Sequence, residues 1–275
     1  MGLQTHNTFM RAIIRWLTRE RPPAAIPLCN FERIRYEVRA GDVVLIEGRT
    51  RVSDVIKYMT QSRWSHSALY IGRLHEIEDP RTRARIKAWF DGQPDVQLIV
   101  ESELGKGTII RPLHAYDQDH IRICRPRDLT YHDVQRITDY AVSRLGSDYD
   151  MRQIFDLFRL LFPWKFLPRR WRSSLFHHNI GTQTRTVCST MIAEAFASVD
   201  YPILPLVERE ENGELRLYRR NPKLFTPSDF DYSPYFEIIK YPFVDITGRH
   251  RRYQLVPYEF KDEELVQSET RVRKI

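Results

Sequence analysis

Two short segments far apart in the chain constrain its fold most: WSHSALYIG around His66 and TRTVCSTMIAEAF around Cys188. In the first segment, a histidine opens a short apolar run that is typical of a β-strand. In the second, a cysteine lies where a loop turns into an amphipathic helix. A thiol at a helix N-terminus meets the positive end of the helix dipole, which favours the thiolate. Because a histidine on a neighbouring strand could act as its base, the segments predict a nucleophilic pair in which the histidine comes first.

The length and composition fit a globular protein of one large domain, or of one domain with extensions. Of the 275 residues, 42% are hydrophobic and 29% are charged, which is unlike a disordered chain. No run approaches the roughly 18 apolar residues of a transmembrane helix. The first residues lack the pattern of a secretory signal and, with His at position 6, that of myristoylation. We therefore expect a cytoplasmic protein, with a peripheral position at the inner membrane left open.

The three cysteines, Cys29, Cys124 and Cys188, are widely spaced and form no CxxC pair. An odd number at such spacing argues against a disulfide framework and against a cysteine-rich zinc site. Cys124 alternates with apolar residues in HIRICRPR and is expected on a strand. No glycine-rich phosphate loop or HExxH pair is present. The sequence therefore implies no metal and no cofactor.

The formal net charge is +7, and much of the basic excess lies in the aromatic-rich segment 155–176. Bulky rings mixed with Arg169, Arg170 and Arg172 suit a membrane interface, with the cations toward anionic lipid. A core-packed helix followed by a solvated basic loop explains the same residues equally well. Nucleic acid is not expected as a partner, because only the net charge and a few arginine clusters favour it.

The order of the elements predicts an α+β protein, since short strands come first and helices follow. We expect strands over residues 41–48, 65–72, 96–104, 107–113 and 120–126, and helices over 53–62, 131–146, 151–162 and 187–199. In the first helix, Ser53 is the expected cap and Val55, Ile56 and Met59 are expected to point inward. The polar stretch 73–94 is interpreted as an insertion between strands.

We divide the chain into three parts. Residues 1–35 hold a short amphipathic helix and a proline-rich linker, because three prolines follow that helix. Residues 36–200 form the catalytic domain. Residues 201–275 are a C-terminal extension packed on that domain.

Over residues 38 to 200 the motifs, taken in order, resemble the permuted papain-like cysteine hydrolases, specifically the YiiX/YebB-like group of the NlpC-type superfamily. The resemblance is carried by GDVVLIEG, WSHSALYIG, VESELGKGTIIRPL and VCSTMIAEAF. In ordinary NlpC-type enzymes the cysteine helix precedes the histidine strand, and here the order is reversed. The resemblance implies a papain-like α+β fold in which a small, mostly antiparallel sheet packs on the nucleophile helix.

The resemblance also implies the catalytic residues. Cys188 matches the nucleophile and His66 matches the base. A polar residue on the strand after the histidine strand would orient the imidazole, and Glu101 fits that position. Glu103 is two residues further along the same strand and points to the same face, so it remains the alternative.

Three residues are candidates for substrate binding. Trp64 and Ser65 directly precede His66 in the sequence. Tyr149 occupies the place where NlpC-type enzymes often carry a tyrosine near the substrate cleft. A helix-cap or core role explains Tyr149 as well.

The expected activity is hydrolysis of an amide or ester through an acyl-enzyme on Cys188. The substrate is an acyl-containing small molecule, a lipid or a peptidoglycan-type peptide. Two alternatives use the same residues differently: an acyltransferase, in which an amine or hydroxyl replaces water, and a non-enzymatic module that binds a membrane surface.

Overall fold

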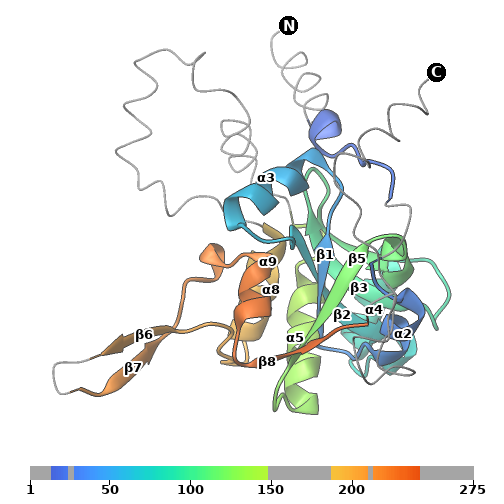
Figure 1. Cartoon of the computed structure of the whole chain (residues 1–275). Coiled ribbons are helices and arrows are strands. Elements are labelled where there is room, and N and C mark those ends of the chain that lie inside the picture. The colour runs from blue at the N-terminus through green and yellow to red at the C-terminus, as the bar shows by residue number, and fades with distance from the viewer. Residues whose placement is uncertain (1–13, 24–27, 148–186, 210–212, 242–275) are drawn as a thin grey trace, which may run out of the picture. The chain divides into compact units, whose positions relative to one another are not determined.

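The computed structural model describes residues 14–23, 28–147, 187–209 and 213–241 (Figure 1). Its helices are α2 (Phe31–Glu37), α3 (Arg51–Thr60), α4 (Pro80–Trp89), α5 (Tyr131–Ser143), α8 (Val187–Ala197) and α9 (Pro227–Tyr232). Its strands are β1 (Val43–Glu47), β2 (His66–Arg73), β3 (Gln97–Glu103), β4 (Gly107–Pro112), β5 (His120–Pro126), β6 (Leu206–Arg209), β7 (Leu215–Tyr218) and β8 (Phe236–Ile239). Chain contacts separate residues 1–241 from 242–275, and all the described residues lie in the first unit.

Six of the strands form one antiparallel sheet in the order β4-β3-β2-β1-β5-β8. The expected strands from residue 41 to residue 126 are all present, and β8 adds residues beyond position 200 to the same sheet. In β2, His66 is the first residue and pairs with Ile46 of β1. The sheet therefore holds this histidine at the end of a central strand. The mixed architecture with an antiparallel sheet is of the α+β class that the sequence predicted.

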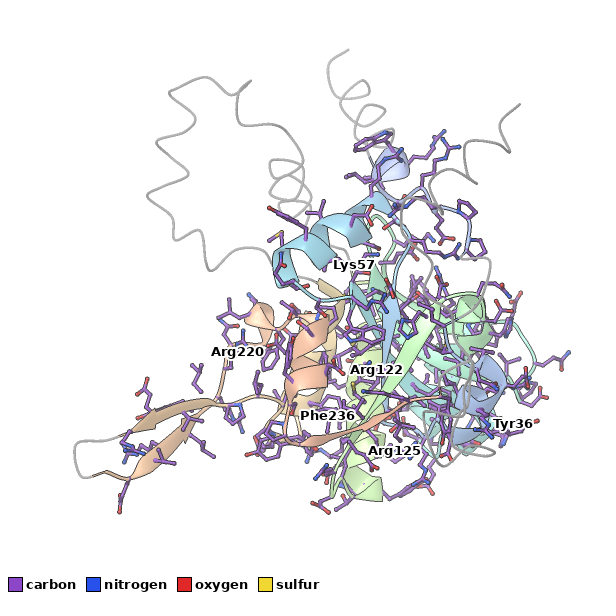
Figure 2. The ribbon with its side chains drawn as sticks, viewed as in Figure 1. Tyr36, Lys57, Arg122, Arg125, Arg220 and Phe236 are labelled. Atoms are coloured by element: carbon purple, nitrogen blue, oxygen red, sulfur yellow. The ribbon has the colours of Figure 1, made fainter. Side chains whose placement is uncertain are left out.

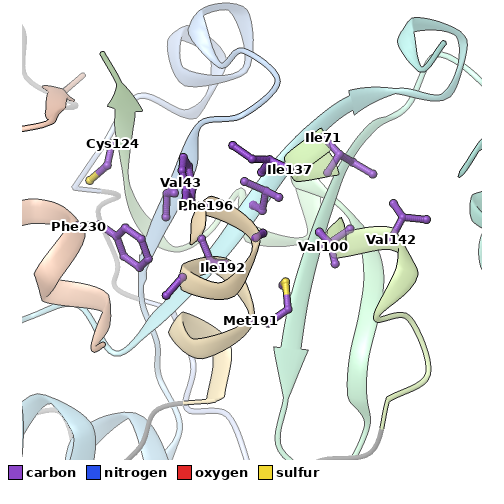
Figure 3. Close-up of a cluster of buried hydrophobic side chains, with 14 of the residues drawn as sticks. Val43, Ile71, Val100, Cys124, Ile137, Val142, Met191, Ile192, Phe196 and Phe230 are labelled. Carbon is purple, nitrogen blue, oxygen red and sulfur yellow. The ribbon is translucent and has the colours of Figure 1, made fainter. Parts of the chain in front are cut away.

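The two faces of the sheet pack against different helices because side chains alternate along each strand. Val43 of β1 and Val100 of β3 share a core with residues of α5 and α8, and Figure 3 shows these strand residues around Ile192 and Phe196 of α8. Val44 faces the other side, in a second core that contains residues of α2. In α8, Ile192 and Phe196 are completely buried. Their packing fixes the helix whose first turn carries Cys188.

Two arginines of β5, labelled in Figure 2, tie neighbouring segments to the sheet. Arg125 forms an ion pair with Asp42 at 2.9 Å, just before β1. Arg122 pairs with Asp231 of α9 at 2.6 Å. Ion pairs of this partly buried kind fix geometry more clearly than they add stability. They hold α9 against the strand that lies beside β1.

The start of α3 differs from the prediction. Its cap is Thr50, whose side chain accepts a hydrogen bond from the N–H of Ser53, so the helix begins two residues before Ser53. Ser53 is buried and its hydroxyl lies 2.9 Å from the Thr50 hydroxyl. The expected inward residues Val55, Ile56 and Met59 are only partly buried.

Residues 73–94, interpreted as an insertion, do lie between β2 and β3, and they contain the helix α4, which was not predicted from the sequence. Asp79 caps this helix by accepting from the N–H of Thr82, and a proline occupies its first position. Only Thr82 and Ile86 are buried. Thr82 also donates to Asp139 of α5 at 2.8 Å, and Arg85 donates to the carbonyls of Ser143 and Leu145. Polar contacts with α5 and the residues after it therefore hold α4 together with the buried Ile86.

Candidate active site

Cys188 is the second residue of α8, in the first helical turn. Backbone N–H groups of a first turn have no intrahelical acceptors, and the helix dipole is positive there. The side chain is 4% exposed, and His66 and Ser67 of β2 lie close enough to the sulfur to lower the pKa of the thiol. The thiol of α8 thus meets the start of β2, as the two sequence segments predicted.

His66 lies between the thiol and a carboxylate. Its Nε2 atom is 2.6 Å from Oε2 of Glu101, and its ring lies close enough to Cys188 for each group to shift the pKa of the other. Since Nε2 is engaged by the carboxylate, Nδ1 is the nitrogen left for the sulfur. The ring is 19% exposed. The three side chains therefore lie in sequence, with His66 between the Glu101 carboxylate and the Cys188 sulfur.

Glu101 is completely buried on β3 and has three partners. Its Oε2 accepts from the Tyr116 hydroxyl at 2.5 Å as well as contacting His66. Arg111 places Nε 3.0 Å from Oε1. Glu103 binds Arg111 at 2.5 Å and Lys106 at 2.9 Å instead. Of the two glutamates that the sequence left open, Glu101 is the one in contact with His66.

The electrostatics favour a thiolate beside an imidazolium. Burial opposes ionisation of Cys188, but the adjacent His66 and the hydrogen bonds from His66 and Ser67 lower the pKa of the thiol below its usual value. Burial also opposes the charged ring of His66, but Cys188 and Glu101 together raise the pKa of His66 to about 10. Burial opposes the charge of Glu101 too, and His66, Arg111 and Tyr116 overcome it to lower the pKa of the carboxyl. Glu101 and His66 are therefore charged near neutral pH, and their charges favour the thiolate of Cys188.

Ser67 contributes a contact that sequence reasoning missed. It is completely buried, and its hydroxyl makes no well-formed hydrogen bond. Yet its backbone and its hydroxyl lie close enough to Cys188 to lower the pKa of the thiol. A buried hydroxyl without a neutral acceptor is costly, and an anionic sulfur is the acceptor that this site offers.

Cys188 and His66 line a pocket of about 120 Å³. Its lining includes the apolar residues Val52, Ile56 and Leu104. It also includes the polar and charged residues Arg49, Glu103, Arg111, Tyr116 and Asp119. A larger hollow of about 440 Å³ lies between α8 and the β6–β7 hairpin and is lined by none of the three candidate catalytic residues. The smaller pocket is the candidate site because it contains the reactive groups.

The predicted binding residues are distributed differently. Ser65 lines the pocket, and its hydroxyl accepts from the N–H of Gly48 at 2.9 Å. Trp64 is buried outside the pocket wall, where its Nε1 donates to Asp231 at 3.2 Å and Arg122 lies over its ring. Tyr149 and the arginines at positions 169, 170 and 172 lie outside the described residues, as does the helix expected over 151–162.

Tyr116 and Arg111 are the site residues that the sequence did not reveal. Tyr116 ends a short 3-10 turn after β4, and Arg111 is one charged residue on a strand. Neither residue lies in a local sequence pattern that would identify it as part of a site.

The described parts of the chain contain no group of three or more His, Cys, Asp or Glu that could hold a metal ion. They also contain no helix long and apolar enough to cross a membrane.

Comparison with known proteins gives one family. Residues 37–157 match the model of the permuted papain-like amidases of the YaeF/YiiX type, family C92. The matched residues include His66 and Glu101, whereas Cys188 lies beyond their end. No curated protein sequence matches the chain.

Among solved structures, the crystal structure of the metalloprotein YiiX from Escherichia coli O157:H7 is similar at 12% identity and a TM-score of 0.44, covering 74% of this chain and 97% of that one. The family match agrees with the motifs and with the observed sheet. Residues 37–157 of the chain are therefore similar to the YaeF/YiiX permuted papain-like amidases.

Proposed function

We propose that the protein hydrolyses an acyl amide or ester through a thioester on Cys188, with His66 as acid and base and Glu101 as the group that orients the ring. The observation that carries the proposal is the chain of contacts from Glu101 through His66 to the sulfur, with Nε2 and Oε2 2.6 Å apart. A nucleophile, a base and an orienting group in hydrogen-bond contact are the arrangement that nucleophilic acyl transfer requires.

The reaction begins from the thiolate and the imidazolium. The Cys188 sulfur adds to the carbonyl carbon, and the negative charge moves to the carbonyl oxygen. The N–H of Cys188, at the start of α8, is available to that oxygen. His66 then gives its proton to the leaving nitrogen or oxygen, the bond to the leaving group breaks, and the acyl group remains on sulfur.

Water completes the cycle. Neutral His66 removes a proton from a water molecule, and the hydroxide adds to the thioester carbon. The C–S bond breaks, the acid is released, and the thiolate and imidazolium are restored. Glu101 stays ionised throughout, because its role is to stabilise the imidazolium and to hold the ring orientation.

The pocket supports an acyl donor with both apolar and polar parts. Val52 and Leu104 offer an apolar wall, and Arg49 and Asp119 a charged one. A lipid amide or ester and a peptidoglycan-type peptide both satisfy this description, and both stay within the proposal. The proposal also includes an anionic membrane surface as the place where the protein acts. Segment 155–176 would then contact that surface.

The test is activity-based labelling with a panel of acyl probes that react with thiols. Mass spectrometry of the intact protein and of its peptides detects the adducts. The proposal expects a single acyl adduct on Cys188 that decays in water. Cys188→Ser should lose the adduct, and Cys124→Ser, a matched change at a buried thiol outside the pocket, should retain it. An adduct on another residue, or none with any probe in the wild type, would overturn the proposal.

A further inference from the structure

The wall of the catalytic pocket includes residues from a part of the chain that precedes the family match. Thr18 and Glu20 line the same pocket as Cys188 and His66. They belong to residues 14–21, which we call the N-terminal strap and which run beside α3 in Figure 1. The matched family region begins only at residue 37. The strap therefore lies outside the matched region and borders the candidate catalytic pocket.

A buried leucine anchors the strap. Leu17 is completely buried, and it forms a small apolar cluster with Ile14, Val52 and Leu104. Val52 of α3 and Leu104 of the β3–β4 turn both line the catalytic pocket. Leu17 thus joins two sides of the pocket that are distant in sequence.

One edge of the strap is fastened to the start of α3. The N–H and Nε of Arg21 both donate to the carbonyl of Arg49 at 3.2 Å, and Arg49 donates back to the carbonyl of Arg21 at 2.7 Å. Arg21 also forms an ion pair with Asp54. Arg51 donates to the carbonyl of Trp16 at 3.0 Å and lies over its ring. These contacts involve both Trp16 and Arg21 of the strap. They therefore fix the strap along the start of α3, beside the pocket.

The other edge meets the β3–β4 turn. Gly105 in that turn has a φ of +82°, and a Cβ atom placed on it would lie 2.9 Å from Cγ2 of Ile14. Glycine is required there both by the backbone conformation and by the closeness of the strap. The strap therefore spans from the β1–α3 connection to the β3–β4 turn, across the pocket.

We infer that the N-terminal strap limits which acyl substrates reach Cys188, by admitting slender acyl groups and excluding bulky ones. The pocket volume of about 120 Å³ suits a narrow group. Glu20 lies at the rim with its carboxylate 3.6 Å from Arg49 and its side chain 65% exposed. Thr18 and Glu20 are thus positioned to contact substrate, and Leu17 holds them there.

The experiment compares two thiol reagents of different size. Iodoacetamide is small, and fluorescein-5-maleimide is bulky. Leu17→Asp should release the strap, since a carboxylate cannot remain in the apolar cluster. We expect labelling of Cys188 by the bulky reagent to accelerate about tenfold or more, as for a site released from local closure, while the iodoacetamide rate stays within about twofold. Peptide-level mass spectrometry separates Cys188 from Cys29 and Cys124.

Two further variants keep the test decisive. Arg19→Ala is the matched control, because Arg19 is exposed on the same strap and does not line the pocket. Arg21→Ala loosens the strap without entering the apolar cluster, and it should show a smaller acceleration of the same kind. Circular dichroism at the labelling temperature checks that each variant is folded.

The inference rests on the proposed nucleophilic role of Cys188, and the small reagent separates the two failures. A Cys188 that reacts slowly with both reagents in the wild type would refute the proposed function. Two results would refute the proposed role of the strap. One is rapid reaction of Cys188 with both reagents in the wild type. The other is an unchanged ratio of the two labelling rates in the Leu17→Asp variant.

Discussion

Cys124 and Cys188 are both buried thiols, 0% and 4% exposed, and their surroundings act in opposite directions. Burial dominates at Cys124, inside β5, and with nearby Asp231 it raises the pKa of that thiol well above its ordinary value. Burial also opposes the thiolate at Cys188, but His66 and Ser67 reverse its effect and lower the pKa. The difference shows that partners, and not exposure, decide which thiol is reactive.

The largest effect expected from this difference is on catalysis. Replacing Cys188 by Ser should lower the hydrolysis rate of an accepted acyl probe by on the order of 10³-fold or more, because the neutral hydroxyl is a far weaker nucleophile here. Cys124→Ser should leave that rate within about twofold. Equal losses in the two variants, at equal folded fraction, would erase the distinction between the two thiols.

The second effect concerns the base. His66→Ala removes the positive charge and the hydrogen bond that favour the thiolate, so the pKa of Cys188 should rise. We expect its alkylation by iodoacetamide at pH 6.5 to slow by roughly 10 to 100-fold, corresponding to a rise of one to two pKa units.

The matched control for that variant is His120→Ala. His120 also pairs with a glutamate, Glu47 at 3.0 Å, but it is not in contact with Cys188. The Cys188 alkylation rate should be unchanged in this control. If both histidine variants slow the reaction alike, a general loss of structure, and not the loss of the base, accounts for the result.

A smaller effect separates the two glutamates. Glu101→Gln removes the carboxylate that, with Cys188, raises the pKa of His66. The imidazolium should then lose its proton at a lower pH than about 10, and the Cys188 labelling rate near neutral pH should fall by about tenfold. Titration of the His66 ring by NMR measures the shift directly.

Glu103→Gln provides the comparison, since Glu103 contacts Arg111 and Lys106 and not His66. The His66 titration should move much less in this variant. A larger shift from Glu103→Gln than from Glu101→Gln would reassign the orienting role.

The smallest expected effect concerns Cys124, whose thiol lies in the core, and it is an effect on stability. Cys124→Ser places a hydroxyl among apolar neighbours, which should lower the free energy of unfolding by about 1–3 kcal/mol. Denaturant unfolding measures the loss. Iodoacetamide labelling of Cys188 in the same variant should be unaffected, and a coupled fall would show that the two thiols are not independent.

The parts of the site that were predicted from sequence are those with a local pattern. His66 opens an apolar strand and Cys188 opens an apolar helix, so both positions carry a signal in their neighbours. Glu101 and Glu103 have the same local pattern, and only the position of β2 beside β3 distinguishes them. Tyr116 and Ser67 act through contacts made across the sheet, which no single segment encodes.

The fold shows the same limit. The strands with alternating or continuous apolar residues were predicted, from β1 to β5. The helix α4 was missed because its sequence, PRTRARIKAW, is mostly charged and buries one large apolar side chain. The start of α3 was misplaced because Thr50 and Ser53 are both good caps, and the choice between them depends on tertiary contacts. The β6–β7 hairpin was missed as well, because all of its strand residues are exposed.

The most direct test of the central claim is the pH dependence of alkylation at Cys188, compared with Cys124 in the same sample. Iodoacetamide labelling over pH 5 to 10, quantified on the two peptides, reports the thiolate fraction at each site. Because the folded pKa of Cys188 is lowered, its rate should rise at a lower pH than that of an ordinary thiol and should then stay level until His66 loses its proton near pH 10. Cys124 should remain almost unlabelled throughout, since its pKa is raised. A Cys188 rate that rises only through pH 8 to 9, as for an ordinary thiol, would contradict the account.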